Sequence, residues 1–188
     1  IFNEDDSKET EKPPPTFNVF LLGNSNTGKT ALLETYKSVT ANHPRTNPTG
    51  APANSQITVK TEIGSAILSV YDTPGQEKFN RMISQYLNVS HAAVFFTDVN
   101  VRQEYKLIKN WVKLVSDNAV DSILYLVATK SDLKWENTKE ELEDYARDNN
   151  MKLFVTTWDE KESIEALFNK IASDLIEKYP DGDEKTFD

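Results

Sequence analysis

Gly23-Asn24-Ser25-Asn26-Thr27-Gly28-Lys29-Thr30 follows an apolar run at 17–22, which has the length of a buried strand, and precedes a segment from Ala31 that favours a helix. The stretch fits the pattern G-x-x-x-x-G-K-[ST]. In that pattern, a glycine turn before a helix N-terminus directs backbone N–H groups at an anion. We therefore predict that residues 23–30 bind phosphate. The alternative is an ordinary glycine turn in a core, which the four fixed residue types make the weaker interpretation.

Four residues of this stretch have a chemical task that follows from their type. Gly23 and Gly28 let the backbone turn sharply and approach phosphate oxygens, because no Cβ stands in the way. Lys29 is expected to reach the outer phosphates as a point charge, and the Thr30 hydroxyl is expected to bind Mg²⁺.

The composition limits the possible functions. The 188 residues suit one domain, and the net charge of −9 gives no electrostatic reason to bind nucleic acid or an anionic membrane. There are no cysteines, hence no disulfides and no cysteine-based zinc site. No apolar run has the length of a membrane span, and no signal peptide is recognisable at the start. Because the first residue is Ile1, we expect a fragment of a longer chain.

The chain divides into three parts by composition. Residues 1–15 hold five acids, two lysines and three consecutive prolines, and we expect a disordered leader. The domain is expected at 16–179, since Pro180 cannot continue a helix. Residues 180–188 hold four acids and one lysine and are expected to form an acidic tail.

Strand and helix signals alternate along the domain. After the strand at 17–22, strands are predicted at 57–63, 66–71, 91–98, 122–128 and 152–156, and helices at 102–117, at 138–149 and from 159 onward. This alternation predicts an α/β fold with a mostly parallel six-stranded sheet, one antiparallel edge strand and helices on both faces. Ligands of such sheets bind outside the carboxyl ends of the strands.

Asp72-Thr73-Pro74-Gly75-Gln76-Glu77 directly follows a predicted strand. Asp72 is placed to reach Mg²⁺ through a water, as in phosphate-loop NTPases. Gly75 can offer its N–H to a terminal phosphate, and the Gln76 amide can orient an attacking water. An acid at a strand-to-loop turn is common, so the evidence lies in the combination.

Thr129-Lys130-Ser131-Asp132 follows another predicted strand. A carboxylate here can accept hydrogen bonds from N1 and N2 of guanine, a donor pair that adenine lacks. The tetrapeptide by itself is weak evidence, and its place in the order of elements makes it specific.

With these motifs together, the chain resembles the Ras-superfamily small GTPases, and within them the Rab branch most closely. The matching stretches are GNSNTGKT at 23–30, DTPGQEKF at 72–79 and TKSD at 129–132, within a resemblance over residues 16–178. The resemblance implies phosphate contacts from Ser25, Asn26, Thr27, Gly28, Lys29 and Thr30. It makes Thr49 a switch residue that binds Mg²⁺, and Gln76 and Lys29 catalytic residues. It makes Thr129, Lys130, Asp132, Thr157 and Trp158 the contacts of the base.

Several residues depart from the family pattern. Thr129 replaces an asparagine, so we expect its reach toward the phosphate loop to be shortened. Trp158 replaces an alanine whose backbone N–H contacts the base, and Asp159 replaces a lysine whose stem lies near it. Residues 41–43 lack the aromatic residue that covers the guanine edge in relatives. We therefore expect guanine specificity with an affinity below the family norm.

The resemblance implies a molecular switch in vesicle trafficking that binds GTP or GDP with Mg²⁺ and hydrolyses GTP slowly. Expected partners are effectors that contact the switch regions 40–55 and 72–88, a GTPase-activating protein and an exchange factor. Such a protein would be cytoplasmic, with peripheral attachment to endomembranes if a prenylated tail is missing from this chain. Two alternatives remain open: a pseudo-GTPase binding module, favoured by the altered base site, and a phosphate-loop kinase or ATPase, for which TKSD would be accidental.

Overall fold

The computed structural model describes residues 12–39, 54–73 and 80–187. Twelve elements follow one another within these ranges: β1 (Thr16–Leu22), α1 (Lys29–Val39), β2 (Asn54–Thr61), β3 (Gly64–Asp72), α2 (Asn80–Leu87), β4 (Ala92–Asp98), the 3₁₀ turn η2 (Glu104–Ile108), α3 (Lys109–Asn118), β5 (Ile123–Thr129), α4 (Lys139–Asp148), β6 (Met151–Val155) and α5 (Lys161–Lys178). None of the helices in these three ranges combines the length and apolar character needed to cross a bilayer.

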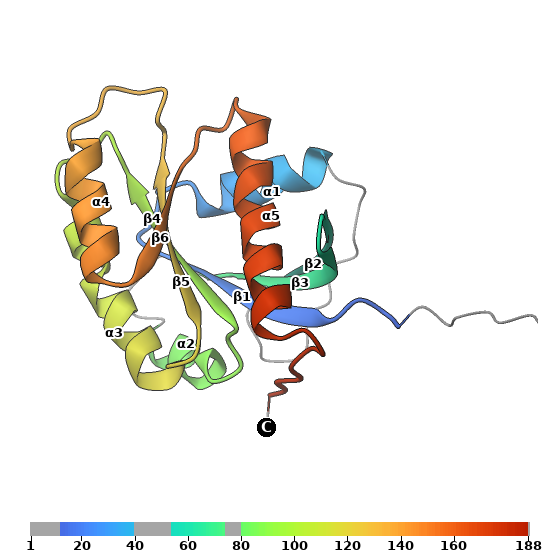
Figure 1. Ribbon diagram of the computed structural model, residues 1–188. Coiled ribbons are helices and arrows are strands. Elements are labelled where there is room, and N and C mark those ends of the chain that lie inside the picture. Colours follow the sequence, from blue (N-terminus) through green and yellow to red (C-terminus); the bar gives the residue numbers. More distant parts are fainter. Residues whose placement is uncertain (1–11, 40–53, 74–79, 188) are drawn as a thin grey trace, which may run out of the picture.

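The strands form a six-stranded sheet in the order β2-β3-β1-β4-β5-β6 (Figure 1). β2 runs antiparallel to β3, and the other neighbours are parallel. In the centre, Val19 of β1 is in register with Val70 of β3 and with Ala92 of β4. The predicted fold class, including the antiparallel edge strand, is confirmed.

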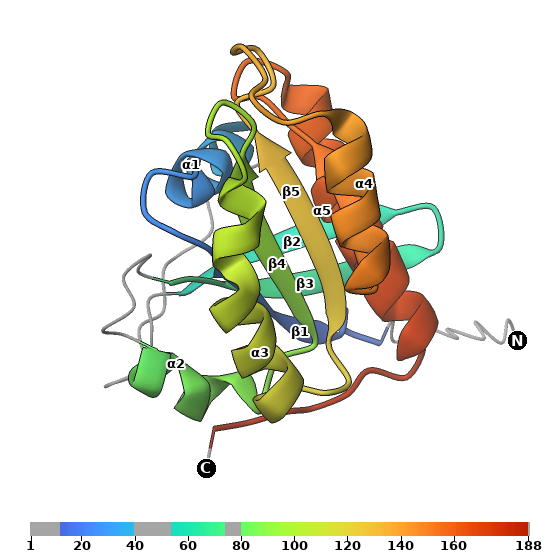
Figure 2. The ribbon, with the colours of Figure 1, turned by 90° about the vertical axis from the view of Figure 1, so that its left-hand side faces the viewer.

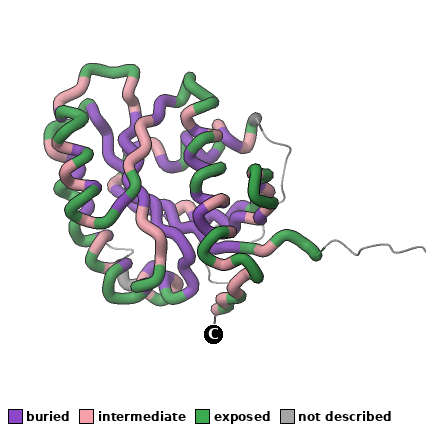
Figure 3. The backbone as a smooth tube through the Cα atoms, viewed as in Figure 1, coloured by how far each residue is buried: buried purple, intermediate pink, exposed green. Residues whose placement is uncertain are grey.

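Helices cover both faces of the sheet, with α1 and α5 on one face and α2, α3 and α4 on the other (Figures 1 and 2). Successive β1 side chains point to opposite faces, so Phe17 lies in the core under α5 and Phe20 in the core under α3. Aromatic pairs fill both cores: the rings of Tyr36 and Phe168 lie 4.2 Å apart on the first face. The buried residues are concentrated along the central strands, which both helix layers cover (Figure 3).

The predicted helix at 102–117 is wrong in its first part. Residues Glu104–Ile108 form the 3₁₀ turn η2, and α3 begins only at Lys109. A 3₁₀ turn has three residues per turn, so Tyr105 and Ile108 face the core. Leu107, which the helical pattern at 102–117 would place beside Ile108 on the buried face, is 59% exposed. The cause is Glu104, which turns inward to accept a hydrogen bond from the Asp98 backbone N–H.

The helix starts differ in how they are capped. Thr138 and Glu141 form a capping box at the start of α4, in which each side chain accepts from the other residue's backbone N–H. Asp159 was expected to open the last helix, but α5 begins at Lys161 without a side-chain cap. Asp159 Oδ1 lies 2.7 Å from the Thr157 hydroxyl instead.

Candidate functional site

The predicted site residues that the structure describes gather at the carboxyl ends of β1, β3, β5 and β6, the last of which is followed by Thr157 and Trp158. Residues 23–30 follow β1, Asp72 ends β3 and Thr129 ends β5. Asp98 ends β4, which lies between β1 and β5 in the sheet. Parallel strands bring these ends to one edge, so residues more than a hundred positions apart come into contact there.

The phosphate loop turns through left-handed backbone conformations, with φ values of 146° at Gly23, 66° at Asn26 and 94° at Gly28. Glycine is required most clearly at Gly23, where a Cβ would lie 3.0 Å from the Phe96 carbonyl oxygen. The Thr27 hydroxyl donates to the Asn24 carbonyl at 2.8 Å and closes the turn. The loop is therefore shaped by its own residues.

Lys29 lies folded back over this loop. Its Nζ donates to the carbonyl oxygens of Gly23 and Asn24, both at 2.8 Å, and the residue is 6% exposed. Burial lowers the pKa of the ammonium, an effect partly offset by Asp72 and Glu104. Beside it a cavity of about 370 Å³ is lined by Ser25, Asn26, Gly28, Lys29, Thr30, Ala31 and Thr73. The first turn of α1 adds backbone N–H groups that lack intrahelical partners.

Thr30 and Asp72 form a pair of oxygen ligands next to the cavity. The Thr30 hydroxyl donates to Asp72 Oδ2 at 2.5 Å. Asp72 Oδ1 is buried and has no hydrogen-bond partner among the described residues. An unpaired buried carboxylate oxygen is costly unless a cation or a water completes it, and hard oxygen donors are what Mg²⁺ prefers. These residues therefore fit a magnesium ion.

Thr129 braces the phosphate loop directly, although its side chain is shorter than the asparagine of the family pattern. Its Oγ1 lies 2.6 Å from the carbonyl oxygen of Thr27 and 3.2 Å from that of Thr97. The short side chain suffices because the end of β5 lies against the loop: a Cβ at Gly28 would stand 3.8 Å from the Thr129 side chain.

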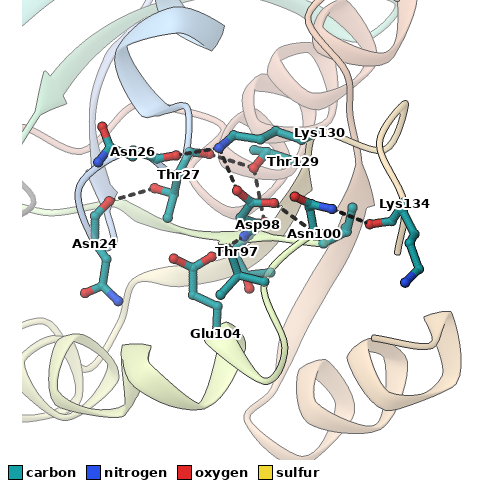
Figure 4. A network of polar contacts seen from close by, with 12 residues as sticks. Asn24, Asn26, Thr27, Thr97, Asp98, Asn100, Glu104, Thr129, Lys130 and Lys134 are labelled. Atoms are coloured by element: carbon teal, nitrogen blue, oxygen red, sulfur yellow. Dashed lines mark hydrogen bonds and ion pairs between the residues drawn. The ribbon is translucent and has the colours of Figure 1, made fainter. Parts of the chain in front are cut away.

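Lys130 connects the loop to β4 (Figure 4). Its Nζ donates to the Asn26 carbonyl at 2.8 Å and to Asp98 Oδ2 at 2.6 Å. Glu104 holds Asp98 in place: its Oε2 accepts a hydrogen bond from the Asp98 backbone N–H, with 2.6 Å between oxygen and nitrogen. Burial raises the pKa of Glu104, the hydrogen bond from Asp98 opposes that rise, and repulsion by the Asp98 carboxylate adds to it.

Sequence reasoning missed Asp98 and Glu104. Asp98 carried a usable signal, because it ends a predicted buried strand at the edge where the motif loops lie. Glu104 carried none, since its inward position depends on the 3₁₀ turn.

A second, mostly apolar cavity of about 140 Å³ adjoins the first. It is lined by Gly28, Ala31, Leu32, Thr129, Lys130, Thr156, Thr157, Trp158 and Ile164. The Thr157 hydroxyl lies 2.8 Å from Asp132 Oδ1 and 2.7 Å from Asp159 Oδ1, which places both carboxylates around one hydroxyl. Trp158 is 67% exposed at the rim. The apolar lining suits an aromatic ring, with Asp132 as a charged acceptor nearby.

Three predicted site residues lie outside the described ranges. Thr49 belongs to 40–53, and Gly75 and Gln76 belong to 74–79. The proposed switch regions, 40–55 and 72–88, are accordingly described only in part.

Comparison with known proteins places this arrangement in a family. The sequence model of the Ras family matches residues 18–177. The Ras-related protein Rab-13 of Mesocricetus auratus is 27% identical over 165 residues, which cover 86% of this chain and 81% of the relative. Rab-19 of Mus musculus is 27% identical over 165 residues (85% and 75%), and Rab-24 of Dictyostelium discoideum is 27% identical over 170 residues (87% and 83%). The chain therefore belongs to the Ras family of small GTPases, as a divergent member close to the Rab proteins.

Proposed function

We propose that this chain is a guanine-nucleotide switch that binds GDP or GTP with Mg²⁺ and hydrolyses GTP slowly. The observation that carries the proposal is that residues 129–132 serve both cavities. Thr129 and Lys130 hold the phosphate loop, and Asp132, two residues further on, stands beside the apolar cavity. A ligand that fills both cavities must carry phosphates at one end and a flat base at the other.

The base end favours guanine. The Thr157 hydroxyl, 2.8 Å from Asp132 Oδ1, positions the Asp132 carboxylate. A carboxylate in this place can accept hydrogen bonds from the N1 and N2 protons of guanine. With adenine, the carboxylate would face the N1 acceptor and lose these bonds. The stem of Lys130 and the side chains of Leu32 and Trp158 line the apolar space for the ring.

The phosphate end supplies charge and positioning for hydrolysis. Lys29 would exchange its two loop carbonyls for phosphate oxygens and neutralise charge that develops on them. Thr30 would hold Mg²⁺ directly, Asp72 through a water, and Thr49 would join them in the GTP state. Held by these residues, Mg²⁺ would help to neutralise the negative charge of the phosphates. Gln76 would orient the water that attacks the γ-phosphate, giving GDP and inorganic phosphate.

The switch would act through partners. We propose that effectors contact 40–55 and 72–88, whose order depends on the γ-phosphate, and that a GTPase-activating protein and an exchange factor set the rates. The Rab relatives support a role in vesicle trafficking, peripherally on endomembranes.

The test is binding of fluorescent GDP, GTP and ATP, with phosphate release as the measure of hydrolysis. We expect both guanine nucleotides to bind in a Mg²⁺-dependent way and ATP to bind at least about 100-fold more weakly. Thr30→Ala should remove the Mg²⁺ dependence, and Thr35→Ala on the same helix is the matched control. Equal binding of ATP would refute the guanine assignment. Guanine-nucleotide binding without hydrolysis would favour the pseudo-GTPase alternative.

A further inference from the structure

The segment after α5 follows the surface of the domain. Residues 180–187 run from the end of α5 past the amino-terminal edge of the sheet toward α2 (Figure 2). We call residues 183–187 the strap. The strap lies away from both cavities of the nucleotide site, so that site does not explain its contacts.

The first anchor of the strap is a buried histidine. His91 is 0% exposed, and its Nδ1 accepts the Asn18 backbone N–H at 2.9 Å. That bond leaves the ring proton on Nε2, which donates to the Asp183 carbonyl oxygen at 3.0 Å. The Asp183 carboxylate lies 3.4 Å from the same nitrogen. Without the strap, a buried ring N–H would lose the protein partner it has here.

The second anchor is made by the backbone and side chain of Lys185. Its carbonyl oxygen accepts the Asn18 side-chain amide at 3.3 Å, and its Nζ donates to the Ser90 carbonyl at 3.3 Å. The ammonium also lies 6.0 Å from the centre of the Tyr179 ring. Both anchors attach the strap to the segment just before β4.

The third anchor is the Phe187 ring, which touches two elements at once. The centre of the Phe187 ring lies 5.1 Å from that of Tyr86 in α2 and 5.9 Å from that of Tyr71 in β3, and both pairs are edge-to-face. Among the acidic and polar residues 181–188, Phe187 is the one large apolar side chain. Tyr71 immediately precedes Asp72, and Tyr86 lies near the end of α2, so the ring joins both ends of the second switch region.

We propose that the strap is an intramolecular ligand that holds α2 against β3 and thereby restrains the second switch. The histidine and Lys185 anchors fix the strap in place, and Phe187 transmits that position to α2. The restraint of α2 by the strap does not depend on a bound nucleotide. Its consequence for nucleotide release rests on the proposed function.

Hydrogen exchange tests the restraint in the whole chain. Phe187→Ala should speed exchange of the α2 amides 83–87 about tenfold and leave the β5 amides unchanged. Thr186→Ala, at an exposed neighbour, is the matched control and should change neither. Unchanged α2 exchange in Phe187→Ala, or an equal change in Thr186→Ala, would overturn the proposal.

The release rate of GDP tests the coupling to the site. Phe187→Ala should release fluorescent GDP severalfold faster than the parent and than Thr186→Ala. Faster α2 exchange with an unchanged GDP release rate would overturn the coupling. Failure of the parent to bind any guanine nucleotide would overturn the proposed function instead, and the exchange comparison would still decide on the strap.

Discussion

Thr129→Val isolates the contact by which β5 braces the phosphate loop. Valine keeps the size and branching of threonine and removes the hydroxyl. Thr129 is 5% exposed, and Thr27, whose carbonyl oxygen accepts the 2.6 Å hydrogen bond, is 0% exposed. The substitution therefore leaves a buried carbonyl without this partner.

The expected cost follows from that burial. Leaving a buried polar group unsatisfied costs about 1–3 kcal/mol. The loop conformation that the bond stabilises is the one that points backbone N–H groups at phosphate. If the cost falls on this conformation, a loss of about 1.4 kcal/mol raises the Kd for GDP about tenfold.

Equilibrium binding of fluorescent GDP, with thermal unfolding of the nucleotide-free protein, measures both effects. Thr129→Ser retains the hydroxyl and should bind GDP within about twofold of the parent, since its oxygen can make the same bond. Thr129→Val with the affinity of the parent would refute the reasoning. It would show that the loop keeps its binding conformation without β5.

Three further outcomes are expected. Gln76→Leu should keep GDP binding and lower the intrinsic rate of GTP hydrolysis about tenfold, measured by single-turnover phosphate release; an unchanged rate would remove Gln76 from the mechanism. Trp158 at the rim of the apolar cavity should shift its emission to shorter wavelength when GDP binds, and Trp158→Phe should abolish the shift; a shift that persists in the variant would come from another tryptophan. Burial, reinforced by Lys185 and opposed by Asp183, lowers the pKa of His91 below its ordinary 6.5. As the pH falls, the imidazole of His91 is therefore protonated in the unfolded chain before it is protonated in the folded one. The contribution of His91 to the free energy of unfolding is fully present above pH 6.5 and decreases below it. The Tm of the parent should fall from pH 7 to pH 5 more steeply than that of His91→Asn, and equal slopes would contradict the assignment.

The sheet was predictable because its signals are local. Continuous apolar runs such as 17–22 and 122–128 mark strands buried on both faces, and the alternation at 57–63 marks the edge strand. Strand ends shifted by a few residues: β2 spans Asn54–Thr61, so Ile63 lies exposed in the turn.

The errors arose where a tertiary contact overrides a local pattern. Residues 102–117 have helical periodicity throughout, yet Glu104 turns inward to the Asp98 N–H and produces a 3₁₀ turn. The predicted helix start at Asp159 was likewise wrong: α5 begins at Lys161, and the Asp159 carboxylate lies against the Thr157 hydroxyl.

The site was predictable in its residues and less so in its contacts. Motif spacing identified Lys29, Thr30 and Asp132, since each chemistry needs a fixed residue type at a fixed distance along the chain. Whether the short Thr129 side chain reaches the loop could not be read from the sequence, because it depends on how closely β5 approaches the loop. The strap had no local signal in the sequence, because its partners are distant along the chain. Asp183 and His91, for example, are 92 residues apart.

The affinities of Asp132→Asn for GDP and for xanthosine diphosphate test the central claim most directly. In the variant, Asn Oδ1 can still accept the Thr157 hydroxyl, which turns the amide NH₂ toward the base. That donor faces the N–H groups of guanine but pairs with the additional carbonyl of xanthine. We predict that the parent prefers GDP and that the variant prefers xanthosine diphosphate, with GDP binding weakened about 100-fold. Unchanged GDP binding by Asp132→Asn would contradict the account.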